Sequence, residues 1–163
     1  MKAALQLLEK HLKTRRPAYY AKLQTGLTET ALGQLEAQYH ISLPPDLKTL
    51  YQWKNGQSSK CYASFVNNSM FAPLESALKT KKLLTEMIGL DFEIENWWNE
   101  NWLPIFSNGG GSAICYDLGG VFTGDKGQLI EFWNDDNDRK VIAPRLLDLI
   151  ECLNQYFKDT TED

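Results

Sequence analysis

The sequence feature that most constrains the fold is the stretch 102–118, in which two apolar segments flank three consecutive glycines. In the second segment, Ile114 and Tyr116 fall on one face and Asp117 on the other, which is the period of two typical of a half-buried strand. The glycines can adopt the positive φ angles that a tight reversal requires. We therefore predict a β-hairpin here, at the centre of a sheet.

Helical patterns lie on both sides of this hairpin in the sequence. Thr28 is a good N-cap residue, and Pro45 suits the first turn of a helix. Apolar residues recur at helical spacing, which predicts helical segments over 2–14, 28–56, 74–88 and 144–157. The segment 28–56 contains two helices joined by a Pro-Pro elbow, and we expect Asn55-Gly56 to end the second of them. Further strands are predicted over 62–66, 128–133 and 141–142, and an irregular connection over 17–27.

The order of helices, then strands, then a helix predicts the α+β class. We expect a single domain with a mainly antiparallel or mixed sheet, surrounded by N-terminal helices and a C-terminal helix. The length of 163 residues fits one domain. Within it we distinguish an N-terminal helix and connection (1–24), the α+β domain (25–157) and a frayed tail (158–163).

Cysteine usage and hydropathy predict a cytoplasmic protein. The three cysteines form no CxxC pair, which argues for reduced thiols and against a disulfide framework or a zinc site. No apolar run approaches the roughly 18 residues that a membrane span requires. The N-terminus mixes leucines with charges and lacks the continuous apolar core of a signal peptide.

Charge is distributed unevenly along the chain, whose net charge is −4. Residues 86–138 hold eleven Asp or Glu and one Lys, whereas residues 1–85 hold twelve Lys or Arg and five Asp or Glu. The acidic block contains four of the five tryptophans and is too apolar for a disordered tail. A folded acidic region repels nucleic acid and attracts basic partners. The alternative is a solvated face that only maintains solubility.

Motifs for catalysis, cofactors and metals are lacking. The glycines at 109–111 do not continue into a dinucleotide fingerprint, and those at 124–127 lack the spacing of a phosphate loop. His11 and His40 have no His or Cys at metal-ligand spacing, and the loop 134–138 lacks the Gly and Glu of a calcium loop. We therefore expect no enzyme activity, no catalytic residue, no cofactor and no metal.

The candidate partner-binding residues lie in the later strands and loops. Asp117 and Glu131 fall on neighbouring predicted strands, where they could form a contact surface or the acid pair of a hydrolase, or point to water. A tryptophan amid acidic residues has the composition of a binding hot spot. The residues that we select for binding a partner are Asp117, Glu131, Trp133, Asp135, Asp136 and Asp138.

Two motifs resemble the SUKH superfamily of Smi/Knr-type domains. The sequence LPPDLKTLY at 43–51, followed by Asn55-Gly56, resembles the family signature LPxDLxxLY…NG. The sequence WLPI at 102–105, the glycine turn and CYDL at 115–118 resemble the family's WLPI…G…C-x-DL hairpin. The resemblance covers roughly residues 25–157.

This resemblance implies an α+β fold without enzymatic activity. Bacterial members are typically immunity proteins that bind and neutralise a toxin domain, often a nuclease, in polymorphic-toxin or toxin–antitoxin systems. Fungal members are binding hubs that regulate cell-wall synthesis. The small size resembles the bacterial kind, so we expect a cytoplasmic immunity protein that blocks a basic toxin domain and binds neither nucleic acid nor membrane. The alternative is a scaffold domain without a toxin partner, and the oligomeric state is left open.

Overall fold

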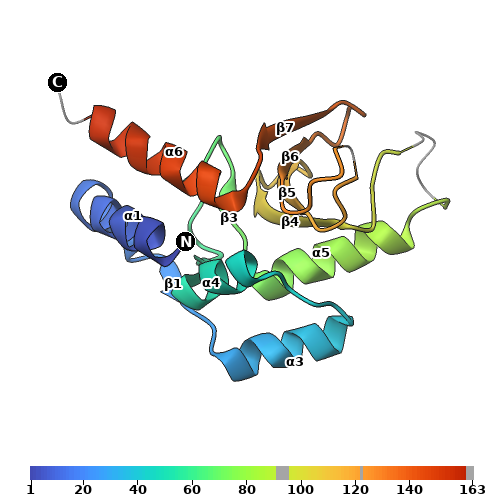
Figure 1. The fold of residues 1–163 in the computed structure, drawn as a ribbon, viewed down its shortest axis with the longest axis horizontal. Helices are drawn as coiled ribbons and strands as arrows, with labels where there is room; N and C mark the ends of the chain where they lie inside the picture. The colour runs from blue at the N-terminus through green and yellow to red at the C-terminus, as the bar shows by residue number, and fades with distance from the viewer. Residues whose placement is uncertain (91–95, 122, 161–163) are drawn as a thin grey trace. The chain divides into compact units, whose positions relative to one another are not determined.

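The computed structural model describes residues 1–90, 96–121 and 123–160 (Figure 1). Its helices are α1 (Lys2–Arg15), α2 (Pro17–Tyr20), α3 (Glu29–Tyr39), α4 (Pro45–Trp53), α5 (Leu74–Glu86) and α6 (Leu146–Asp159). Its strands are β1 (Leu23–Thr25), β2 (Lys54–Gln57), β3 (Met70–Phe71), β4 (Trp102–Ser107), β5 (Ala113–Asp117), β6 (Leu129–Phe132) and β7 (Arg139–Ala143). The predicted α+β class, with antiparallel sheets and helices at both ends of the chain, is confirmed.

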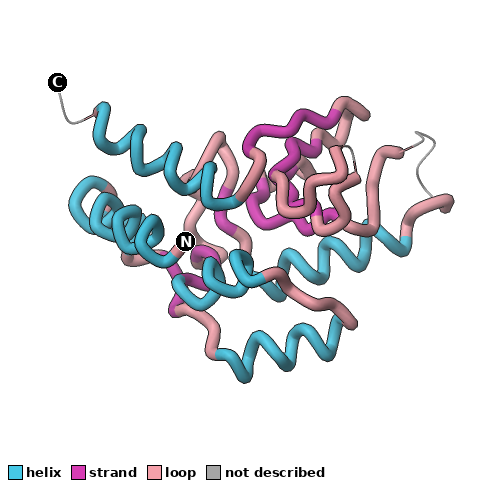
Figure 2. Tube along the Cα trace, viewed as in Figure 1, coloured by secondary structure: helices cyan, strands magenta, loops and turns pink. Residues whose placement is uncertain are grey.

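The chain divides into two compact units. The first combines Met1–Ala63 with the residues from Arg145 onward, and the second is Ser64–Pro144. The first unit therefore holds α1, α2, α3, α4, α6 and the sheet β1-β2, whereas the second holds α5 and the five-stranded sheet. Figure 2 distinguishes the helices (cyan) from the strands (magenta).

In the first unit, α1 packs against α6. Leu5, Leu8 and Leu12 of α1 are buried at the spacing of one helical face, which confirms the predicted apolar stripe. Thr28 caps α3 as predicted, because its hydroxyl accepts a hydrogen bond from the backbone N–H of Ala31 at 3.1 Å. The start of α3 and the buried face of α1 therefore agree with the sequence prediction.

Two local predictions in the first unit are wrong. Residues 17–27 are not irregular throughout, since they contain α2 and β1. Asn55-Gly56 does not end a helix either, because α4 ends at Trp53 and both residues lie in β2. β2 pairs with β1, which lies far away in the sequence, and this pairing places Asn55-Gly56 in a sheet. Propensity is overridden here by non-local pairing.

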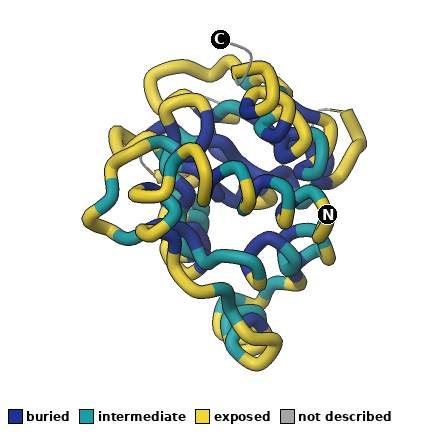
Figure 3. The backbone as a smooth tube through the Cα atoms, turned by 90° about the vertical axis from the view of Figure 1, so that its left-hand side faces the viewer, coloured by how far each residue is buried: buried dark blue, intermediate teal, exposed yellow. Residues whose placement is uncertain are grey.

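In the second unit the strand order is β3-β4-β5-β6-β7, and every neighbouring pair is antiparallel. The predicted hairpin is confirmed as β4 and β5, and β5 is the central strand. Four of the five residues of β5 are buried, so both of its faces are covered rather than one. Figure 3 colours the backbone by burial, with buried residues in dark blue. The predicted strand 62–66 is absent among the described residues, where Val66 forms only a single bridge with Ser69.

An aromatic cluster fills one face of the five-stranded sheet. Trp98, Trp102 and Phe132 meet edge-on or tilted, with ring centroids 5.2–6.4 Å apart. Cys115 and Ile130 complete this cluster, and Leu84 of α5 packs against it. This face of the sheet therefore belongs to the hydrophobic core. Most of the candidate residues lie in β6 and in the loop that connects it to β7.

Candidate protein-binding surface

Asp117 does not lie on a surface, which corrects its selection as a partner-binding residue. Its side chain is fully buried at the end of β5. Its carboxylate accepts hydrogen bonds from the backbone N–H groups of Gly119, Gly120 and Val121 at 2.8–3.0 Å, and from Nε2 of Gln128 at 2.8 Å. A carboxylate with four donors satisfies the amides of a tight turn. Asp117 therefore holds the turn that follows β5.

Asp117 and Glu131 do not form an acid pair, so the hydrolase interpretation is wrong. Glu131 lies opposite Ile114 in the register of β5 and β6. Opposite residues share a face, whereas residues three apart on one strand point to opposite faces. Asp117 is three residues beyond Ile114, so the two carboxylates lie on different sides of the sheet.

The end of β6 exposes a carboxylate and an indole. Glu131 is partly exposed, and 46% of Trp133 is exposed. On the neighbouring strand, Lys140 stands opposite Glu131 in the register. Within the described part of the chain, however, the ion pairs do not include Glu131. Glu131 thus retains a carboxylate that is available to a partner.

The loop between β6 and β7 presents three more carboxylates. Asp135, Asp136 and Asp138 are all exposed, in keeping with the frequency of Asp and Asn in turns. One oxygen of Asp136 accepts the backbone N–H of Asp138 at 2.6 Å. None of the three forms an ion pair with another described residue. We use the name β6–β7 surface for Glu131, Trp133, Asp135, Asp136 and Asp138.

Arg139 anchors this loop, a role that sequence reasoning missed. Its guanidinium donates to the backbone carbonyls of Trp97, Asp136 and Asp138 at 2.7–2.8 Å. It also lies over the ring of Phe132, 4.6 Å from the centroid. Burial lowers the pKa of Arg139, and the nearby carboxylates of Asp136 and Asp138 oppose that shift. Because Arg139 bonds to carbonyls, the acidic side chains stay free to face outward.

Asn134 ties the start of the same loop to the tip of the β4–β5 hairpin. Its amide Nδ2 donates to the carbonyl of Gly110 at 2.9 Å, and its Oδ1 accepts the hydroxyl of Ser112 at 3.0 Å. Its own carbonyl accepts the indole N–H of Trp97 at 3.0 Å. The β6–β7 surface therefore starts from a fixed position, since both ends of its loop are hydrogen-bonded to neighbouring segments.

A pocket of about 150 Å³ lies beside this surface. Its lining includes Glu131 and Trp133 from the surface, Ile114 from β5, and the turn residues Asn67 and Asn68. Asn67 and Asn68 both have positive φ, a conformation that Asn adopts more readily than most other residues. Five of the six selected residues thus lie in the short segment 131–138, and two of them, Glu131 and Trp133, line a concave feature that the sequence did not indicate.

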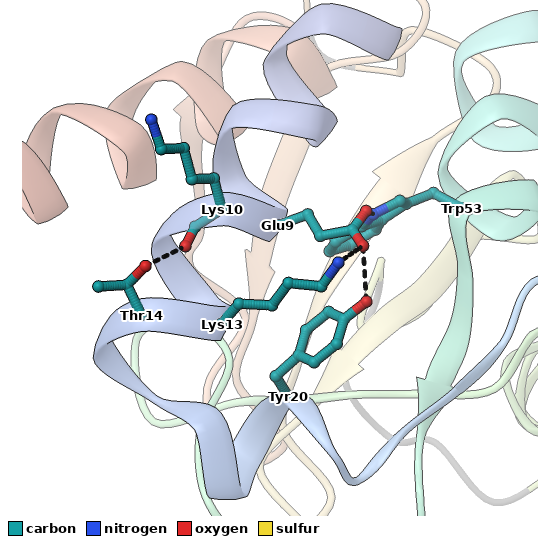
Figure 4. Close-up of polar contacts among 6 residues, drawn as sticks. All are labelled: Glu9, Lys10, Lys13, Thr14, Tyr20 and Trp53. Carbon is teal, nitrogen blue, oxygen red and sulfur yellow. Dashed lines mark hydrogen bonds and ion pairs between the residues drawn. The ribbon is translucent and has the colours of Figure 1, made fainter.

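A second polar cluster lies in the first unit, around Glu9 (Figure 4). The carboxylate of Glu9 accepts the hydroxyl of Tyr20 at 2.6 Å and the indole N–H of Trp53 at 3.1 Å, and it pairs with Lys13 at 2.7 Å. These contacts lower the pKa of Glu9 to about 2. The carboxylate of Glu9 thus contacts side chains of α1, α2 and α4 and stabilises the packing of these helices. Because its hydrogen-bonding capacity is used within the fold, we do not assign Glu9 to a binding site.

Two further features are absent from the residues that the structure describes. Those residues contain no group of three or more His, Cys, Asp or Glu side chains placed to hold a metal ion. None of the described helices combines the length and apolar character needed to cross a bilayer.

Comparison with known proteins agrees with the resemblance of the two sequence motifs. A family model described as SMI1 / KNR4 family (SUKH-1) matches residues 26–152, which is well over half of the chain. No curated protein matches the chain. Both motifs that carry the resemblance, at 43–51 and at 102–118, fall inside the matched range. The chain therefore belongs to the SMI1/KNR4 family (SUKH-1) and is a Smi/Knr-type domain.

Proposed function

We propose that this protein is a cytoplasmic, non-enzymatic immunity protein that binds and neutralises a basic toxin domain, most simply a nuclease. The observation that carries the proposal is the β6–β7 surface. It exposes four carboxylates without ion-pair partners among the described residues, in the same short segment as a tryptophan that is 46% exposed. Membership of the SMI1/KNR4 family supports the proposal, because bacterial members typically act as immunity proteins.

The charge of the surface fits a nuclease partner. A nuclease must hold phosphate groups, so its active cleft carries Lys and Arg. An acidic surface is steered toward such a cleft and competes with the substrate for it. The tryptophan supplies the apolar contact that charge alone does not provide, because hot spots of binding energy are enriched in tryptophan. Inhibition of the toxin then requires only that the bound protein occludes the cleft, without any reaction catalysed by this protein.

Reversal of three charges tests this proposal. The partner is first identified by co-purification from the source cells and mass spectrometry. Asp135, Asp136 and Asp138 are then changed together to Lys, and protection of cells that express the toxin is measured. We expect protection to be lost, because the reversed loop repels a basic cleft.

The matched control reverses three exposed carboxylates outside the surface, those of Glu29, Asp125 and Glu151, which likewise form no ion pair with another described residue. This control variant has the same net charge as the test variant, and we expect it to protect. Full protection by the test variant would remove the three Asp carboxylates of the loop from the mechanism. Loss of protection by both variants would show that only overall charge matters.

A further inference from the structure

The pocket beside Trp133 has the size and lining of a site for one planar cationic group. Its volume is about 150 Å³, and a cavity of that volume in another protein holds a single aromatic ring such as benzene. Ile114, which shares a face of the sheet with Glu131, contributes apolar surface, while Glu131 contributes a carboxylate and Trp133 an indole. Its described lining contains no Lys or Arg, although Lys140 of β7 stands opposite Glu131 in the register. The lining itself therefore offers a carboxylate and a π face.

Several polar groups of this pocket have no hydrogen-bond partner among the described residues. They are the carboxylate of Glu131, the indole N–H of Trp133 and the side-chain amides of Asn67 and Asn68. Asn108, which also lines the pocket, differs because its Oδ1 accepts the backbone N–H groups of Gly110 and Ser112 at 2.8 and 3.1 Å. The pocket thus offers a carboxylate and two amide oxygens to an incoming donor.

The rim of the pocket is already held in place. Asn67 and Asn68 have φ angles of 44° and 58°, as in the two-residue turn of a hairpin. Backbone hydrogen bonds between Val66 and Ser69 close this turn at 2.7 and 3.2 Å. On the other side, Glu131 belongs to β6, which pairs with strands on both sides. Because little ordering remains to be done on binding, the entropic cost of filling the pocket is small.

We propose that this pocket receives an arginine side chain of the partner. A guanidinium is planar and always charged, so it can stack on the Trp133 indole while it donates to the Glu131 carboxylate and to the amide oxygens. A lysine ammonium carries the charge but lacks the plane, so it fits less well. This inference rests on the proposed function, and it names the residue type by which a basic partner engages the surface.

The test titrates the whole protein with N-acetyl-arginine amide, and with the lysine and citrulline analogues. Binding is followed by NMR at the indole N–H of Trp133. We expect a saturable shift with the arginine probe, a weaker one with lysine and none with citrulline, which keeps the shape of arginine but is uncharged. Glu131→Gln should weaken arginine binding by roughly fivefold or more. The control Asp125→Asn, which removes an exposed carboxylate outside the pocket, should leave it unchanged.

Equal shifts with arginine and citrulline, or an arginine shift that survives Glu131→Gln, would overturn the assignment. The amide spectrum of β6 shows whether each variant keeps its fold. Failure here is distinguishable from failure of the proposed function. A protein that neutralises its toxin through Asp135, Asp136 and Asp138, but does not bind the arginine probe, would refute the pocket alone. One that binds the probe, but tolerates the triple charge reversal, would refute the surface and leave the pocket.

Discussion

Asp117 and Glu131 are chemically similar side chains on adjacent strands, yet their surroundings give them different roles. Asp117 is fully buried and accepts four hydrogen bonds, whereas Glu131 is partly exposed and accepts none from the described residues. A buried carboxylate is tolerated only where donors replace its water shell. The first therefore contributes to folding and the second is available for recognition.

Asp117→Asn tests the structural role of the buried carboxylate. The amide keeps the size of the side chain but replaces one acceptor oxygen with a donor, so buried backbone N–H groups lose their partner. We expect the free energy of unfolding to fall by about 2–3 kcal/mol, measured by urea denaturation. Glu131→Gln is the control and should change it by less than about 0.5 kcal/mol, as surface substitutions usually do. Equal stability of both variants would contradict the role given to Asp117.

Glu9 predicts a specific loss of stability in acid. Its pKa is lowered from 4.5 to about 2, mainly by hydrogen bonds from Lys13 and Tyr20. A lowered folded-state pKa means that the ionised form stabilises the fold above the unfolded-state pKa, and that this contribution is lost as the pH falls from about 4.5 to about 2. Glu9→Gln should reduce stability near neutral pH by about 1–2 kcal/mol. The difference between the two proteins should shrink over that acid range.

The measurement for Glu9 is urea denaturation of both proteins across the same pH range. The control is Glu29→Gln, which changes an exposed carboxylate of the same type for which the structure gives no ion pair. A constant difference between wild type and Glu9→Gln at every pH would show that the charge of Glu9 is not the source of its contribution.

At the scale of the elements, the β6–β7 hairpin depends on Arg139. Its planar guanidinium reaches three carbonyls at once, which a lysine ammonium on a flexible stem cannot reproduce in the same geometry. Arg139→Lys should therefore loosen the loop while it keeps the charge. We expect hydrogen exchange of the loop amides to accelerate by roughly tenfold, because about 1–1.5 kcal/mol of local hydrogen bonding is lost.

Lys140→Arg is the control for this loosening, since Lys140 is exposed on the same strand and should tolerate the change. Exchange rates are compared between the loop and the amides of β4 and β5, which should not change. Unaltered loop exchange in Arg139→Lys would mean that Asn134 alone fixes the loop.

The elements that the sequence predicts correctly are those with strong local signals. The hairpin at 102–118 combines alternation with a glycine turn, and the helices at 2–14 and 74–88 have clear stripes. The missed elements are short and depend on partners elsewhere in the chain. β2 forms from Lys54–Gln57 because β1 pairs with it, and no pattern within four residues indicates that.

The same distinction between local and distant signals holds for the residues of the candidate site. Exposure of the loop 134–138 follows from its composition, so Asp135, Asp136 and Asp138 could be placed from the sequence. Burial of Asp117 could not, because it depends on the turn at 119–121 folding back onto the carboxylate. The anchoring of Arg139 depends on Trp97, which lies 42 residues away. Contacts between distant segments leave no local pattern.

At the scale of the whole molecule, the central feature is the segregation of charge along the chain. The net charge of −4 is small, but it results from an acidic block at 86–138 and an excess of basic residues before it. Attraction between exposed charges is screened beyond a distance of about 8–10 Å near physiological salt. The local arrangement of carboxylates on the β6–β7 surface therefore matters more for recognition of a partner than the net charge of the whole protein does.

The most direct test of this account is the salt dependence of the association rate between the protein and its toxin, measured by stopped-flow fluorescence. Steering by the β6–β7 surface predicts that the rate constant falls by roughly 10–100-fold from low to high salt. It also predicts that reversal of Asp135, Asp136 and Asp138 makes association slow at low salt, and that the rate of this variant rises with salt because screening weakens the repulsion. A wild-type rate that does not respond to salt, or a triple variant that associates as fast as wild type at low salt, would contradict it.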